Sequence, residues 1–210
     1  AAVPSVPLSR SPLAFVVAQI RFPLVTSISD ESFIGPFQEQ LRSTYGDLRR
    51  EDETQVLVGP DGVHNVRGGV VWRFSDGPDG WEVALTPEFV ALATGNYTNR
   101  EDFLTRLRQM VEALESWLHP PKVRRLGVRY IDRIQEESNL VRLSELLRLE
   151  VVGPYNVPSP EAVKLNNVLT DCDYAFSDDS LLRARWGFLG ARTTFDPALA
   201  PVDTPSWVLD

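Results

Sequence analysis

The chain has 210 residues, of which 43% are hydrophobic and 24% charged, and its formal net charge at pH 7 is −8. This composition is typical of an ordinary globular protein and excludes a disordered or fibrous one. The negative charge argues against bulk nucleic-acid binding, because such proteins need excess cations to displace counterions from phosphate. The basic residues are 19 Arg and 2 Lys, so a local arginine-rich face remains open.

The cysteine and hydropathy patterns limit the possible sites and compartments. Cys172 is the only cysteine, so an internal disulfide and a four-cysteine zinc site cannot form. No apolar run approaches the length of a membrane span, and the first residues lack a charged segment followed by an apolar one. We therefore expect a cytoplasmic protein without a membrane segment.

The chain opens with an extended arm, strand and helix. Prolines within residues 1–13 prevent a helix there and predict an extended arm. Residues 14–22 alternate as a strand. Asp30 or Ser32 can cap the following helix, which would place Pro36 in its first turn.

A hairpin and further strands are predicted next. Residues 47–53 read as an acidic link before a short strand at 55–58, and residues 59–62 form a strong turn signal. The strand at 66–75 is interrupted by Gly68-Gly69, which can form a β-bulge.

The first unit closes with a strand, a long helix and a central strand. In the strand at 81–86, Trp81 faces the core and Glu82 faces the arginines. Asn99 caps a long amphipathic helix that ends before Pro120-Pro121. The strand at 124–134 then completes a β-α-β-β-β-α-β unit.

The remaining sequence is interpreted as a second, degenerate copy of this α+β unit. A short helix is expected at residues 143–149, with strands near 163–176, 181–191 and 206–210. The predicted fold class is α+β: a mostly antiparallel sheet with helices on one face, built from two related units of which the second is incomplete. The predicted organisation is an N-terminal arm (1–13), a first unit (14–134) and a second unit (126–210) that shares the central strand.

Several short motifs in serial order carry a resemblance to a known family. They are Gln19-Ile20-Arg21-Phe22, Leu126-Gly127-Val128-Arg129-Tyr130-Ile131, Leu182-Arg183-Ala184-Arg185-Trp186-Gly187 and Ser206-Trp207-Val208-Leu209-Asp210. Together they resemble a sporadically distributed bacterial protein family of uncharacterised function. The resemblance implies a bacterial protein whose distribution is similar to that of toxin–antitoxin and phage-defence loci. Because members usually continue beyond the last motif, we also expect this chain to be truncated at its C-terminus.

Four predicted strands place an arginine beside an aromatic residue that must face the opposite way. The arginines are Arg21, Arg73, Arg129 and Arg185. In the central strand Leu126, Val128 and Tyr130 form the apolar face, which we expect to lie in the core. With Glu82, the arginines either form a polar mosaic of ion pairs or converge to bind an anion bidentately. Trp72 or Trp186 could instead anchor a protein partner.

Signatures of cofactor binding and catalysis are missing. The sequence has no phosphate-binding Gly-rich loop and no Gly-x-Ser-x-Gly elbow, so no cofactor is predicted. His64 and His119 read as surface residues and Cys172 as a half-buried bystander. Asp171 and Asp173 share a strand face and can either hold a metal ion or pair with arginines of the neighbouring strand.

Two functions of different classes follow. The first is a non-catalytic cytoplasmic recognition module that binds a partner protein, as a component of a toxin–antitoxin or phage-defence locus would. The alternative is an enzyme or sensor for a phosphorylated small molecule or nucleic-acid end, which would use the arginine-lined face. Whether the protein is an enzyme stays open, with the missing signatures favouring a non-catalytic role.

Overall fold

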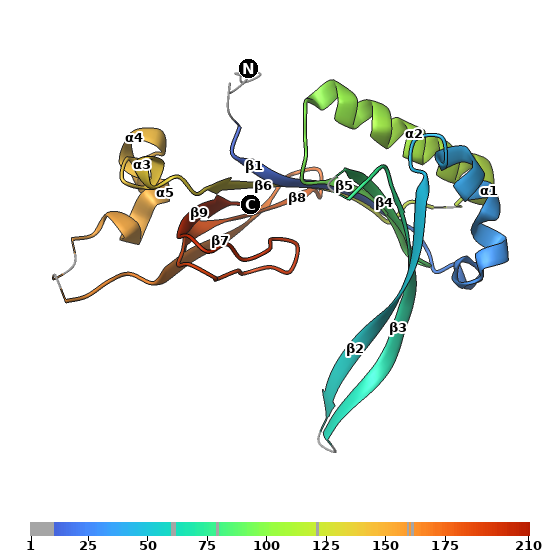
Figure 1. The fold of residues 1–210 in the computed structure, drawn as a ribbon, viewed down its shortest axis with the longest axis horizontal. Helices are drawn as coiled ribbons and strands as arrows, with labels where there is room; N and C mark the ends of the chain where they lie inside the picture. The colour runs from blue at the N-terminus through green and yellow to red at the C-terminus, as the bar shows by residue number, and fades with distance from the viewer. Residues whose placement is uncertain (1–10, 60–61, 79, 121, 159, 161) are drawn as a thin grey trace. The chain divides into compact units, whose positions relative to one another are not determined.

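A computed structural model describes residues 11–59, 62–78, 80–120, 122–158, 160 and 162–210, and the side chains within 53–68 lie outside the description. The fold is α+β, and its strands form a mostly antiparallel sheet, as predicted (Figure 1). The chain divides into two compact units. The first unit is Val16–Arg129, and the second combines Ala1–Phe15 with Tyr130–Asp210.

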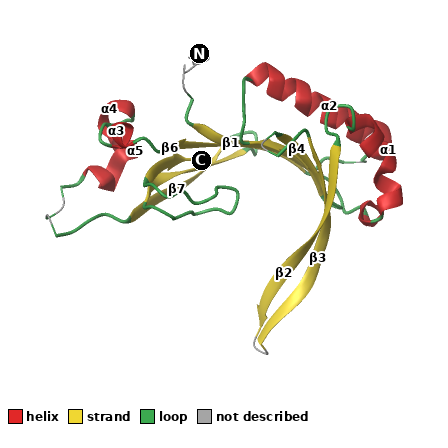
Figure 2. Ribbon diagram, in the orientation of Figure 1, coloured by secondary structure: helices red, strands yellow, loops and turns green. Residues whose placement is uncertain are grey.

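The first unit contains most of β1 and the elements up to α2. They are β1 (Leu13–Arg21), α1 (Glu31–Leu41), β2 (Asp47–Gly59), β3 (Gly62–Ser75), β4 (Trp81–Leu85), β5 (Phe89–Thr94) and α2 (Arg100–Leu118), with a 3₁₀ turn at Thr26–Ser29. The strands lie in the order β2-β3-β4-β5-β1, and each neighbour is antiparallel. Both helices cover one face of this sheet (Figure 2).

The core of the first unit follows from strand alternation. Trp72 pairs with Leu85 and Phe74 with Val83, so apolar side chains line up across adjacent strands on the face beneath α1 and α2. All four side chains are buried. The indole Nε1–H of Trp72 donates a 2.7 Å hydrogen bond to the carbonyl oxygen of Ile28, which joins the sheet to the turn before α1.

Both long helices begin at the predicted caps. Asp30 accepts a hydrogen bond from the Ser32 amide at 2.9 Å, and Asn99 accepts one from the Asp102 amide at 2.9 Å. The expectation that Pro36 lies in the first turn of α1 was wrong, because Asp30 rather than Ser32 caps the helix and the proline falls in the second turn.

The strand boundaries also needed correction. The predicted acidic link at 47–53 is the start of β2, because its backbone pairs with Val71–Ser75 of β3. β5 was not predicted, because it contains two alanines and alanine is depleted in strands generally. The bulge prediction is confirmed, since Gly68-Gly69 opposes a single residue of β2.

The second unit holds the C-terminal part of β6 and the elements after it. They are β6 (Arg125–Ile134), α3 (Glu137–Leu140), α4 (Leu143–Leu146), α5 (Leu149–Val152), β7 (Asn167–Ala175), β8 (Leu181–Leu189) and β9 (Ser206–Leu209), with a 3₁₀ turn at Gly153–Asn156. The strands lie in the order β6-β9-β8-β7. The helix predicted at 143–149 is wrong in extent, because Leu147 is extended and separates α4 from α5.

Both faces of the second unit's sheet carry an apolar cluster. On one face Trp207 packs with Leu140, Leu143 and Val152 of the three short helices. On the other, Ile131, Val208 and Leu189 pack with Leu199 of the segment 190–205. In both units the first strand pairs antiparallel with the last, β1 with β5 and β6 with β9.

The substitution Trp72→Phe tests the link between sheet and helical layer. It leaves the buried Ile28 carbonyl without its donor and removes part of a fully packed side chain, so we expect a loss of about 2–4 kcal/mol in the free energy of unfolding. Urea titration measures this. Trp117→Phe is the matched control, because its indole also donates to a backbone carbonyl, that of Phe33, but is only half-buried. Equal losses in the free energy of unfolding of the two variants would contradict a special role for the Trp72–Ile28 hydrogen bond.

Candidate functional site

Arg73 lies on the sheet face of the first unit that points away from the helices. Its Nε donates to Glu51 at 2.6 Å and its Nη1 to Glu82 at 2.5 Å. Burial alone would lower the pKa of Arg73, but the hydrogen bonds to the two glutamates outweigh it and the pKa is raised. The positive charge of Arg73 is therefore matched within the protein by two carboxylates.

Arg21 shares that face with Arg73 but does not approach it. β4 and β5 separate β3 from β1, and three strand spacings amount to roughly 14 Å. Arg21 instead lies 3.9 Å from Glu88 and over the ring of Phe89, at 5.8 Å from its centroid.

A small pocket beside Arg21 contains two further arginines. Arg21, Phe22, Glu88, Arg124 and Arg125 line it. The Arg124 amide donates a 2.8 Å hydrogen bond to the Arg21 carbonyl oxygen, which fixes the two segments together. The lining residues therefore include three arginines and one glutamate. Arg124 and Arg125 were not among the predicted site residues, although both fall in the predicted strand at 124–134.

Arg185 belongs to the second unit and is also paired. Its Nε donates to Asp210 at 2.9 Å, its Nη2 contacts both Asp210 and Asp196, and its guanidinium lies 4.6 Å from the ring centroid of Phe195. Two backbone hydrogen bonds also join Arg185 and Asp210. The arrangement orders the end of β9 on β8. Arg129, the fourth predicted arginine, is half-buried on β6.

The paired acids on β7 contact an arginine. Arg183 on β8 donates from Nε to Asp171 at 3.0 Å and also contacts it through Nη2, and Asp173 lies 3.8 Å from the same guanidinium. The hydrogen bonds from Arg183 lower the pKa of Asp171. Within the described parts of the chain, no group of three or more His, Cys, Asp or Glu residues is placed to hold a metal ion.

The remaining candidate side chains occupy surface positions or lie outside the description. His119 ends α2 in the left-handed conformation, with φ of 46°, and shares a hollow with Glu112 and Glu115. Cys172 is a half-buried free thiol. The side chain of His64 is outside the described residues.

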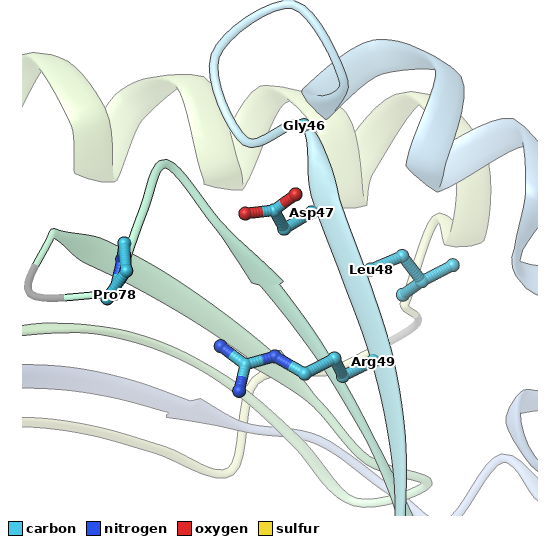
Figure 3. A pocket seen from close by; sticks show the side chains of 5 residues that line it. All are labelled: Gly46, Asp47, Leu48, Arg49 and Pro78. Carbon is cyan, nitrogen blue, oxygen red and sulfur yellow. The ribbon is translucent and has the colours of Figure 1, made fainter.

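A second hollow lies where β2 begins. Gly46, Asp47, Leu48, Arg49 and Pro78 line it, and Figure 3 shows the Asp47 carboxylate and the Arg49 guanidinium on the side of Pro78, with Leu48 pointing away. Asp47 and Arg49 are both exposed, so water screens their charges. Among the described residues, the lining of this hollow contains no further charged group.

The apolar side of the central strand is not in the core. Leu126 is 61% exposed and Val128 47%, and Tyr130 is exposed as well, so the expectation that these residues are buried was wrong. The reason is tertiary: alternation predicts which residues share a face, but not whether a helix covers that face. Trp72, considered as a partner anchor, is fully buried, and Trp186 is half-buried under the short helices.

A second exposed apolar surface lies at the outer end of the β7–β8 hairpin. We call it the hairpin patch; it consists of Tyr174, Phe176 and Leu182, whereas the exposed Leu181 lies on the other face of the hairpin. Tyr174 and Leu182 are directly paired across the strands, at 48% and 49% exposure. They lie on the same sheet face as Trp186, beyond the part that the short helices cover.

Asp132 is a half-buried carboxylate on that same sheet face. It stands opposite Leu209, and within the described residues no hydrogen bond or ion pair reaches its carboxylate. Burial raises the pKa of Asp132. The carboxylate therefore weakens the folded state when it is ionised.

Comparisons with known proteins supply no further assignment, since no family model, curated protein or solved structure matches the chain. Among the described helices, none is both long and apolar enough to cross a membrane.

The pH dependence of Asp132→Asn tests the assignment of this carboxylate. Because the folded pKa lies above the unfolded one, the stability from protonated Asp132 is complete below the unfolded pKa and is lost as pH rises through the folded pKa. The asparagine mimics the protonated form. We expect Asp132→Asn to raise the melting temperature at pH 7, with a gain that shrinks as pH falls.

The control for this experiment is Asp178→Asn. Hydrogen bonds from Ser180 lower the pKa of Asp178, so its removal should cost stability at pH 7 and nothing in acid. Thermal unfolding from pH 3 to pH 8 measures both variants. A gain for Asp132→Asn that is independent of pH would contradict a titrating carboxylate.

Proposed function

We propose that this protein is a non-catalytic recognition module that binds a partner protein through the hairpin patch. We propose further that it is a cytoplasmic bacterial protein associated with a toxin–antitoxin or phage-defence locus, on the resemblance of its serial motifs to the sporadically distributed family. The observation that supports partner binding is the exposure of three large apolar side chains on one face of the β7–β8 hairpin.

The hairpin patch is not accounted for by the fold. Arg183, Asp171 and Asp173 form a charged surface on the opposite face of the same two strands, as expected for a sheet face in water. The patch face is also in water, yet Tyr174 and Leu182 are each about half exposed and Phe176 is 52% exposed. Contiguous exposed apolar side chains on a folded domain mark interaction sites.

The covered sheet in the first unit indicates what such a face requires. There, α1 and α2 pack on the apolar face of the described part of the sheet, and Phe103, Met110 and Leu114 of α2 are buried. In the second unit the helices are three single turns, and they cover only the end that holds Trp186 and Trp207. A partner that presents an apolar surface would complete the burial.

Partner capture with the double variant Tyr174→Asp/Leu182→Asp tests the proposal. Two buried charges at the centre of an interface should weaken binding by about 30-fold or more. The affinity-tagged chain is expressed in its native bacterium, and mass spectrometry quantifies the proteins that co-purify. We expect one partner in near-equal amount with the native chain and its loss with the double variant.

Val141→Asp is the matched control, because Val141 is an exposed apolar residue of the same unit outside the patch. This variant should retain the partner, and all three proteins should have similar melting temperatures. Equal partner recovery with the double variant, or no stoichiometric partner with the native chain, would overturn the proposal.

A second candidate function is the sensing of a phosphorylated small molecule. The pocket beside Arg21 supports it, because three guanidinium groups and one carboxylate leave an excess of positive charge in the protein's acidic background. Arg73 and Arg185 give it no support, since each is bonded to carboxylates of the protein.

Calorimetric titration with adenosine monophosphate and inorganic phosphate tests this candidate. We expect binding by the native chain to weaken by about tenfold or more in Arg124→Gln/Arg125→Gln, because two charge-assisted contacts are lost. Arg100→Gln/Arg108→Gln, on the exposed side of α2, is the control and should bind as the native chain does. Undetectable binding at millimolar phosphate would exclude this role.

A further inference from the structure

Arg133 is a buried arginine in the second unit. It stands on β6 opposite Val208 and, by alternation, on the sheet face of Ile131, which the segment 190–205 covers. Only 8% of the residue is exposed. Its Nη1 donates a 2.7 Å hydrogen bond to the carbonyl oxygen of Ala200, and its amide donates one of 2.7 Å to Pro12.

The other edge of this guanidinium has donors without acceptors. Within the described residues, Nε and Nη2 of Arg133 are closed from solvent and have no hydrogen-bond partner. The hydroxyl of Ser206, which is 1% exposed, is likewise without a partner. Ser206 precedes Val208 by two residues on β9, so it lies on the same sheet face and diagonally opposite Arg133. The Cα atoms of such diagonal neighbours are roughly 7–8 Å apart.

A buried guanidinium in this state is costly. Burial lowers the pKa of Arg133, and no carboxylate of the described chain lies near enough to offset its charge. The arm that contacts β6 through Pro12 supplies no counter-charge either, because residues 1–10 contain no Asp or Glu.

The chemistry of the open edge indicates one ligand class. Nε–H and Nη2–H point in parallel, and a carboxylate accepts both. The same unit uses this edge on its own acids, since Nε and Nη2 of Arg183 bind the two carboxylate oxygens of Asp171. One guanidinium balances one negative charge, and the Ser206 hydroxyl supplies a third donor.

We propose that Arg133 and Ser206 form a binding site for a small monocarboxylate, with the guanidinium edge holding both oxygens and the hydroxyl donating to one of them. Because these atoms are closed from solvent, the ligand is of formate or acetate size and reaches them when the segment 190–205 lifts. This site shares no residue with the hairpin patch, so a test of carboxylate binding is independent of the test of partner binding.

Anion-dependent stability of the native chain tests the site. Thermal unfolding at pH 7 is followed in sodium acetate, formate, phosphate and chloride at equal ionic strength. We expect acetate and formate to raise the melting temperature in a saturable way relative to chloride and phosphate. Arg133→Met should abolish this difference, and Ser206→Ala should weaken acetate binding about tenfold, because it removes one hydrogen bond to a charged group.

Arg192→Met is the matched control, because Arg192 is an exposed arginine of the covering segment that pairs with Asp203; it should respond to acetate as the native chain does. A second measurement needs no variant. In the native chain, the side-chain Nε–H resonance of Arg133 should shift with acetate and become protected from exchange. Equal effects of all anions would mean an adventitious ion only, and an unshifted resonance would mean that water alone occupies the edge; either result overturns the proposal.

Discussion

The burial of one apolar sheet face under helices is the constraint on which this structure depends. In the first unit, aligned pairs such as Trp72 with Leu85 produce a continuous apolar surface, and two helices of 11 and 19 residues remove it from water. Apolar burial is the main favourable contribution to folding, so the first unit has a complete core of its own. The second unit repeats the pairing of first with last strand but covers less of the face.

Ion pairs lie on the sheet faces that the helices do not cover. On the faces turned away from the helices, Arg73, Arg183 and Arg185 are bonded to acids of adjacent strands or loops. Such partly exposed ion pairs each add little to the free energy of unfolding, but they provide hydrogen-bond acceptors for the guanidinium groups. Two charged residues of the second unit, Arg133 and Asp132, differ from these pairs. Within the described parts of the chain, Arg133 has donors without acceptors, and Asp132 on the other face has a carboxylate without a donor.

Much of the fold was predictable from local pattern, because strand alternation and helix capping depend on neighbours in sequence. Asp30 and Asn99 cap their helices as predicted. The errors arose where tertiary packing decides. Nothing local indicates that Leu126 would be exposed, or that the segment 190–205 would bury Arg133. Arg124 falls in the predicted central strand, but its position beside Arg21 depends on a hydrogen bond between segments distant in sequence.

The acids of β7 have a consequence for how this protein can associate with others. In the strand order β7 is the last strand of the second unit, so one side of its backbone has no neighbouring strand there. Such a strand invites β-augmentation by a foreign chain, and inward charges are a known protection against it. Asp171 and Asp173 would meet the side chains of any added strand and repel acidic or apolar ones. Edge-to-edge association into fibres is therefore disfavoured, and a partner protein would bind to the face of the sheet.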